Sequence, residues 1–373
     1  MRNLTEFEQA ALSGEVNLSD GHPRHDLTGR QLQIIGRLSD IFFETRVQNF
    51  RDLEIRAQQS FMTGLGQYSA PVTDDRVFSV YSSSVTTMAV ASFLRRHNHK
   101  AAVIHPTFDN IPDLLRDMIE LVPITEQELA DGDFDALLAK NVTCVFVTTP
   151  NNPTGWVLEE AAFGRLVAFA AAHRLLLCFD TSFRGFDIRT QFDGYKLLED
   201  SEVDYLVIED TGKLWPVAEL KLSFISTSKS VRADIEHGLS DVLLSVSPFV
   251  LGVVDALARD GAEGGYSTLH RLIADNRQEV ARTLNDLTEI EMPDTESRIS
   301  VCRLLFPSAA RAAQVHEKLL GMNVHILPCM PFHWNAPDEG GSYLRIALAR
   351  DPKLIMVALD RLRAVARNSS ARV

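Results

Sequence analysis

The chain has 373 residues, of which 45% are hydrophobic and 23% charged, a composition typical of globular proteins. Its formal net charge of −13 argues against broad contact with nucleic acid or an anionic membrane, and leaves room for a cationic substrate. No apolar run approaches the roughly 18 residues that a membrane span needs, and residues 1–15 contain no hydrophobic signal core. We therefore expect a cytoplasmic protein that is not exported.

The first 30 residues are predicted to form a polar arm. Thr5 and Glu8 have the spacing of a capping box, which predicts that a short helix starts at Thr5. Residues 20–23, Asp-Gly-His-Pro, are a turn signal. Residues 32–49 then have helical periodicity.

From residue 77 short apolar runs alternate with amphipathic helices, which is typical of an α/β fold with a mostly parallel sheet covered on both faces. In such sheets ligands bind beyond the carboxyl ends of the strands. Predicted strands are 77–80, 101–104, 142–148, 175–179, 205–208 and 222–226; predicted helices include 111–118 and 159–172.

The pattern changes after about residue 245. Two long helices, 250–259 and 266–284, precede predicted strands at 299–306, 324–327 and 342–347, as expected for a smaller α+β domain. The predicted division is an arm of residues 1–30 that closes over the active site, a large cofactor-binding domain of 31–245, and a small domain of 246–373.

The four cysteines, Cys144, Cys178, Cys302 and Cys329, are widely spaced and form no CxxC pair. Cys144 and Cys178 lie in apolar strand-like runs and are most simply buried thiols in a reducing compartment.

Three polar signals follow predicted strands. The first is Thr149-Pro-Asn-Asn152-Pro-Thr-Gly155, where an Asn amide projects a donor and an acceptor above the sheet. Asp180 ends the next strand, and a carboxylate there must be paired or solvated. Lys213 follows a third strand, and a desolvated lysine amine is a nucleophile that forms Schiff bases. Taken alone, Asp180 is an ordinary capping or salt-bridged residue and Lys213 a surface lysine.

Together these signals, with Asp180 28 residues after Asn152 and Lys213 33 residues after Asp180, resemble fold-type I pyridoxal-phosphate (PLP) enzymes of the aminotransferase superfamily. The resemblance implies Asn152 on the phenolic oxygen of the cofactor, Asp180 on its ring nitrogen, and Lys213 as the Schiff-base lysine. It also implies a large domain with a mostly parallel sheet sandwiched by helices, plus the smaller α+β domain. Further implied cofactor contacts are Ser83, Ser84, Phe108, Ser182 and Lys221, and Arg345 is implied to grip the substrate α-carboxylate.

Three departures from the superfamily pattern are informative. Phe183 replaces the usual tyrosine three residues past the aspartate, and Lys221 replaces the usual arginine eight residues past the lysine. Asp210 stands where a hydroxyl residue is usual. A negative charge is unsuited to a phosphate site and would instead suit a cationic substrate side chain.

These departures resemble the narrower family of PLP- and O2-dependent L-arginine oxidases and 4-hydroxylases of guanidine-containing antibiotic pathways (the enduracididine type). The resemblance is also carried by residues 17–22, 81–84, 105–110, 180–186, 209–216 and 332–334. That resemblance implies oxidation of free L-arginine by O2 to 2-oxo-5-guanidinovalerate, its 4-hydroxy derivative, or both, with ammonia and hydrogen peroxide. It implies Thr5, Glu8 and Asp210 as substrate contacts and His22 as an active-site histidine.

Alternatives remain at the level of the residues. Glu8 also suits the third helical position of its own capping box, and His22 a solvent-facing turn. An aminotransferase acting on a basic amino acid is the second enzyme reading, and a non-catalytic PLP-fold sensor the third. The superfamily resemblance further implies a homodimer in which Tyr68 reaches the phosphate of the neighbouring subunit.

Overall fold

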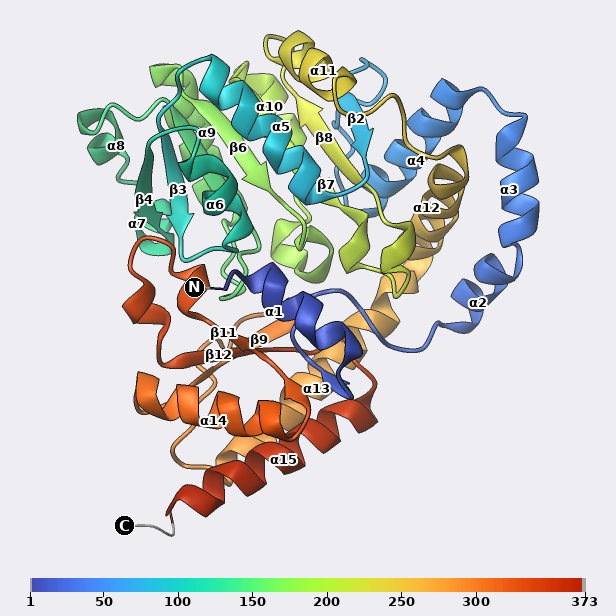
Figure 1. The fold of residues 1–373 in the computed structure, drawn as a ribbon. Helices are drawn as coiled ribbons and strands as arrows, with labels where there is room; N and C mark the ends of the chain where they lie inside the picture. The colour runs from blue at the N-terminus through green and yellow to red at the C-terminus, as the bar shows by residue number, and fades with distance from the viewer. Residues whose placement is uncertain (1, 371–373) are drawn as a thin grey trace.

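A seven-stranded sheet dominates the computed structural model, which describes residues 2–370 (Figure 1). The strand order is β2-β8-β7-β6-β5-β3-β4. Strands β4, β3, β5, β6 and β7 run parallel, whereas β8 is antiparallel to both of its neighbours. The strands are β2 (Val77–Val80), β3 (Ala101–His105), β4 (Leu121–Thr125), β5 (Cys144–Thr148), β6 (Leu176–Asp180), β7 (Tyr205–Asp210) and β8 (Ser223–Thr227). The predicted mostly parallel sheet is confirmed.

The central strands are almost entirely apolar up to their carboxyl ends because both faces of the sheet are covered. In β5, Phe146 packs in a cluster with side chains of α5, α6 and α11, while its neighbours Val145 and Val147 join the larger core on the other face. That larger core includes side chains of α4, α9 and α12. The helices through this region are α2 (Gly29–Gly36), α3 (Leu38–Arg46), α4 (Phe50–Gly64), α5 (Ser83–Arg96), α6 (Asn110–Arg116), α7 (Glu126–Asp131), α8 (Asp135–Ala139), α9 (Glu160–His173), α10 (Gly194–Ser201), α11 (Arg232–Ser240) and α12 (Pro248–Asp260).

A smaller antiparallel sheet, in the order β11-β12-β9, lies below the large one in Figure 1. Its strands are β9 (Val301–Leu305), β11 (Leu327–Pro328) and β12 (Tyr343–Ala347), and the helices of this region are α13 (Tyr266–Asn285), α14 (Ala309–Gly321) and α15 (Pro352–Ser370). The predicted single strand 324–327 is wrong. The segment forms two separate strands. β10 (Val324–His325) pairs in parallel with β1 (Val16–Asn17) of the arm, whereas β11 belongs to the small sheet.

Strand β4 was not predicted from the sequence. Pro123 lies at its centre, and proline lacks the N–H that a central strand needs. The proline is tolerated because β4 is an edge strand of the sheet and pairs only with β3.

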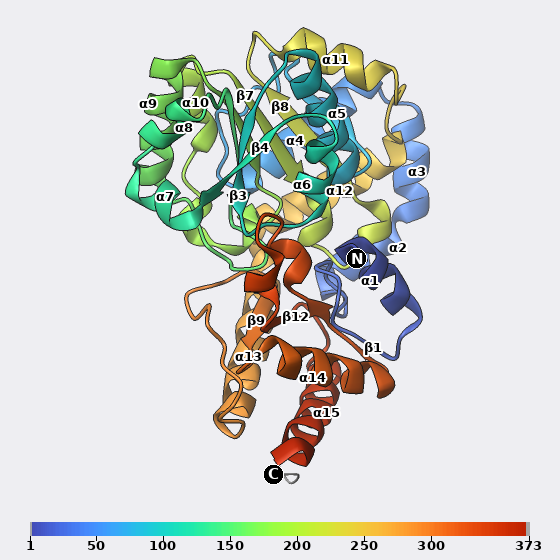
Figure 2. The same ribbon diagram turned by 60° about the vertical axis from the view of Figure 1, so that its left-hand side comes forward.

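The arm begins with helix α1 (Leu4–Ala10), which lies at the junction of the two sheets in both views (Figures 1 and 2). The predicted capping box of Thr5 and Glu8 is wrong. Asn3 caps the helix by accepting from the Glu6 amide, and the Glu6 side chain accepts from the Asn3 amide in return. The capping pair therefore lies two residues earlier in the chain than predicted, and the side chain of Glu8 takes no part in the cap.

In the described part of the chain, no helix has both the length and the apolar character needed to cross a membrane. The division into an arm and two domains remains a prediction.

Candidate active site

A cavity of about 200 Å³ lies beyond the carboxyl ends of β5, β6 and β7 and brings the predicted site residues together. All thirteen predicted side chains line it: Thr5, Glu8, His22, Ser83, Ser84, Phe108, Asn152, Asp180, Ser182, Asp210, Lys213, Lys221 and Arg345. Gly21, Ser82, Thr148 and Phe183 complete the lining. Four larger cavities, of about 490, 590, 390 and 260 Å³, contain none of the thirteen.

Asp180 is a buried carboxylate without an ion-pair partner among the described residues. Its Oδ1 accepts from the amide of Ser182 at 2.9 Å and from the hydroxyl of Ser182 at 2.5 Å. No described group donates to Oδ2. Burial raises the pKa of Asp180, and the two bonds from Ser182 oppose that rise only in part. A buried carboxylate of this kind calls for a cationic N–H partner in the cavity.

Two lysines converge on one histidine of the arm. The Nζ of Lys213 lies 3.5 Å, and the Nζ of Lys221 3.1 Å, from Nε2 of His22. The Lys213 ammonium also lies over the ring of Phe183, 5.7 Å from its centroid. Burial lowers the pKa of Lys221. Such a concentration of positive charge suits an anionic ligand.

The charge of Lys213 and burial lower the pKa of His22 to about 4, although its bond to Asp20 acts in the opposite direction. The imidazole is therefore neutral at neutral pH. It can accept a proton, or accept a hydrogen bond from a water molecule, which a protonated ring cannot do.

This depressed pKa predicts an acid-sensitive fold. An unfolded chain binds a proton at His22 near pH 6.5, whereas the folded chain resists it until about pH 4, so stability falls as the pH drops through this window. In the cofactor-free protein, His22→Gln should reduce the acid-induced loss of unfolding free energy by about 3 kcal/mol at pH 4. Urea unfolding at several pH values between 4 and 7 measures this free energy. His237→Gln, at an exposed position of α11, is the control; equal pH slopes for both variants and the parent would contradict the assignment.

The N-terminus of α5 forms one wall of the cavity. Ser82 caps the helix by accepting from the amide of Val85 at 3.3 Å, and the first amides of any α-helix have no intrahelical partner. Ser83 and Ser84 therefore present N–H groups and hydroxyls where the helix dipole favours an anion. The Ser83 hydroxyl donates to Oδ2 of Asp210 at 3.2 Å, so Asp210 borders this same wall.

Arg345 also lines the cavity and is fully buried. Its Nη1 donates to Oδ1 of Asn152 at 3.1 Å, its Nη2 donates to the carbonyl of Ser19, and its Nε has no partner among the described residues. The Glu8 carboxylate lies 3.6 Å from Nη2. Burial raises the pKa of Glu8, and the charge of Arg345 opposes that rise. The guanidinium of Arg345 thus already faces one carboxylate and keeps an unused donor for another.

Residues that the sequence analysis did not single out hold the arm in place. Arg350 is fully buried and donates to three arm carbonyls: Asn17 at 2.8 Å, Asp20 at 2.7 Å and His22 at 2.6 Å. Asp109 accepts from the amide of Leu4 at 2.7 Å, and burial raises the pKa of Asp109 to about 6. The only sequence signal for Arg350 is one arginine at the end of the apolar run 346–349, and nothing in that run points to the arm.

Comparisons with known proteins agree with this geometry. The family model described as aminotransferase class I and II matches residues 46–362. A solved structure of MppP soaked with the product 2-ketoarginine is 41% identical, with a TM-score of 0.91, and the match covers 94% of this chain and 99% of that one.

More distant matches show the fold alone. Aspartate aminotransferase from Thermus thermophilus with maleate is 15% identical with a TM-score of 0.78, covering 98% of this chain and 97% of that one. LL-diaminopimelate aminotransferase of Syntrophobacter fumaroxidans (strain DSM 10017 / MPOB) is 22% identical over 257 residues, which are 65% of this chain and 62% of the relative. The match thus spans about three fifths of the length of such curated relatives.

Proposed function

Because the chain belongs to the aminotransferase class I and II family, with the fold-type I architecture of PLP-dependent enzymes, we propose that it oxidises free L-arginine with O2. The products are 2-oxo-5-guanidinovalerate, its 4-hydroxy derivative, or both. One observation carries the proposal: the cavity that holds Lys213 and Asp180 also holds Glu8 and His22 of the arm. The similarity to MppP, a protein soaked with its product 2-ketoarginine, supports the same substrate.

The residues present fit PLP. Asp180 supplies the unpaired buried carboxylate that a protonated pyridine nitrogen needs. Ser83, Ser84 and Lys221 supply donors and positive charge for a phosphate. Lys213 supplies the amine for covalent attachment. We propose that Asn152, Ser182 and Phe108 complete the cofactor contacts.

The substrate contacts follow from charge. Arginine carries a carboxylate at one end and a guanidinium, with five N–H donors, at the other. Arg345 has an unpartnered Nε for the carboxylate, and Glu8 and Asp210 are the acids available for the guanidinium, with Thr5 beside Glu8 on α1. Binding the α-carboxylate at Arg345 releases Glu8 from its 3.6 Å contact and makes it available to the guanidinium.

In the proposed mechanism PLP, when bound, provides the electron sink that makes the Cα–H bond of arginine acidic. Nζ of Lys213 takes the Cα proton. Asp180 keeps a proton on its partner nitrogen, and Arg345 holds the carboxylate of the substrate. One O2 accepts two electrons and two protons and leaves as hydrogen peroxide, while water supplies the oxo oxygen and ammonia departs.

The 4-hydroxy product needs a second O2, reduced to a second hydrogen peroxide, and a second water that adds at C4. Neutral His22 is placed to orient that water, since its Nε2 faces the cavity lysines. The arm, held by Arg350 and Asp109, keeps bulk water from the intermediate between the two oxidations.

Glu8→Gln tests the substrate contacts. Losing a hydrogen bond to a charged group costs roughly 1.5–3 kcal/mol, so KM for L-arginine should rise about 10- to 100-fold, with a smaller change in kcat. Glu6→Gln, two residues earlier on α1, is the matched control, because Glu6 only closes the capping box. Equal KM values for the two variants would remove Glu8 from the substrate site.

Product analysis by mass spectrometry tests the reaction. L-Arginine incubated in air and labelled water, without any oxo acid, should give 2-oxo-5-guanidinovalerate, the 4-hydroxy derivative, or both, with label from water in each new oxygen. The alternative, an aminotransferase for a basic amino acid, would instead form glutamate from 2-oxoglutarate without O2.

We also propose a homodimer, as is usual for this fold. Tyr68 is 74% exposed in the single chain and is the residue we expect to reach the phosphate site of the neighbouring subunit.

A further inference from the structure

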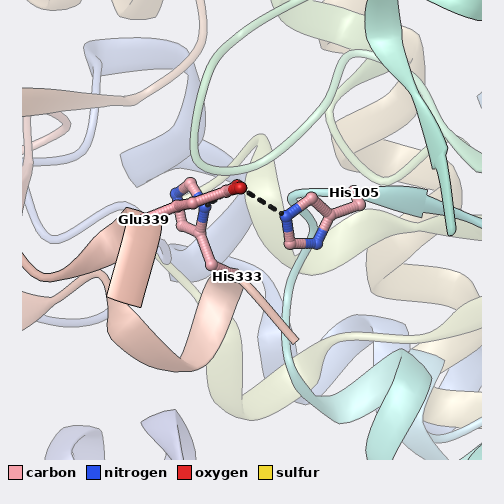
Figure 3. Close-up of side chains that lie close together, drawn as sticks. All are labelled: His105, His333 and Glu339. Carbon is pink, nitrogen blue, oxygen red and sulfur yellow. Dashed lines mark hydrogen bonds and ion pairs between the residues drawn. The ribbon is translucent and has the colours of Figure 1, made fainter. Parts of the chain in front are cut away.

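Two buried histidines and a glutamate meet outside the active-site cavity (Figure 3). His105 ends β3, while His333 and Glu339 lie more than 200 residues later, at the short helical turns 330–332 and 337–340. His105 is 8% and His333 6% exposed, whereas Glu339 is 64% exposed. The cluster therefore joins two distant segments and opens to solvent on the side of Glu339.

The distances among the three side chains are those of a ligand set. Oε2 of Glu339 lies 3.3 Å from Nε2 of His105 and 3.7 Å from Nδ1 of His333. One ligand atom from each of the three residues lies within 4.8 Å of the others. Donors about 2.0–2.1 Å from a tetrahedral zinc ion are about 3.3–3.5 Å apart, so little movement would bring all three onto one ion.

The buried imidazoles also lack other partners. Both ring nitrogens of His333 and Nδ1 of His105 are buried and make no hydrogen bond with any described group. Buried polar atoms are normally satisfied, and exceptions call for an explanation such as an ion. The rings are held firmly, since His333 stacks on Tyr343 at 6.2 Å and the Trp334 indole donates to the carbonyl of Ile104 at 3.0 Å.

We propose that His105, His333 and Glu339 form a binding site for a divalent transition-metal ion of the zinc class. Ions of this class bind readily to two imidazoles and one carboxylate, whereas Mg²⁺ and Ca²⁺ favour sites made of oxygen ligands alone. Solvent on the side of Glu339 supplies the fourth ligand. The ion fastens residues 333–339 to the end of β3, next to the loop that carries Phe108 of the active site.

Calorimetric titration of the chelator-dialysed holoenzyme with Zn²⁺ tests the site. We expect one ion per chain with micromolar affinity, weakened at least about tenfold by His333→Asn and by Glu339→Gln, and no comparable binding of Mg²⁺. Glu339 is exposed, so Glu339→Gln should fold normally; an unchanged PLP absorbance verifies this. Zinc-edge X-ray absorption should show nitrogen and oxygen ligands without sulfur.

His97→Asn is the matched control. His97 pairs with Asp234 at 3.3 Å on the surface, a histidine–carboxylate contact of the same kind without two buried rings. Loss of zinc binding in His97→Asn but not in Glu339→Gln would overturn the proposal, and so would the absence of binding to the parent protein. In either case the cluster would be a hydrogen-bonded contact between two segments and nothing more.

Discussion

Lys213→Ala is expected to abolish turnover of L-arginine. The amine of Lys213 is the group that we propose attaches PLP and takes the Cα proton, and no other lysine lining the cavity follows a strand end in the same way. A positioned general base alone contributes about 10²- to 10⁴-fold, so the combined loss should be at least about 10⁴-fold. The long-wavelength absorbance of covalently bound PLP should disappear as well.

Lys221→Ala is the matched control for Lys213. It removes a second ammonium from the same cavity, 3.1 Å from His22. We expect this variant to keep the absorbance of covalently bound PLP and to bind the cofactor more weakly, because it loses charge from the phosphate site. Retained absorbance and turnover in Lys213→Ala would contradict the role assigned to Lys213.

Asp180→Asn should have the second largest effect. Asparagine keeps the shape but cannot stabilise a protonated ring nitrogen, so activity should fall about 10²- to 10⁴-fold. PLP should still attach to Lys213, which separates this variant from Lys213→Ala. Steady-state kinetics together with the absorbance spectrum measures both properties.

Ser182→Ala is expected to weaken, without removing, the proposed interaction of the Asp180 carboxylate with the ring nitrogen of PLP. It removes the 2.5 Å hydroxyl bond to Oδ1 of Asp180 and leaves the carboxylate in place. The loss of one hydrogen bond to a charged group predicts a fall of roughly tenfold or somewhat more. If Asp180→Asn were no worse than Ser182→Ala, the negative charge at position 180 would not matter to the reaction.

Much of the site was predictable because parallel strands deliver side chains to one edge. Asn152, Asp180 and Lys213 each follow a strand, and the strands β5, β6 and β7 are neighbours in the sheet. Periodicity and turn residues locate such strand ends. Their positions at strand ends pointed to one edge of the sheet, and the resemblance to PLP enzymes implied that they share one site.

The arm could not be predicted in the same way. The Thr5–Glu8 spacing suggested a capping box, but Asn3 and Glu6 offer the same chemistry two residues earlier and form the capping box in the structure. Long-range contacts, among them the packing of Leu4 in one cluster with Phe332 and the contact of Glu8 with Arg345, fix which face of α1 points inward. Local spacing does not contain such long-range contacts.

Arg350 illustrates a further limit. Its three bonds to arm carbonyls join residues more than 300 positions apart, and a backbone carbonyl has no sequence signature. The splitting of the predicted strand 324–327 has the same origin, because β10 pairs with β1 of the arm.

Oxygen uptake on addition of L-arginine alone tests the central claim most directly. The account predicts that purified, PLP-loaded protein consumes O2 in an electrode chamber without any 2-oxo acid, and releases ammonia and hydrogen peroxide. If no O2 were consumed, and glutamate formed from 2-oxoglutarate under anaerobic conditions, the chain would be an aminotransferase and the proposed oxidase activity would be wrong.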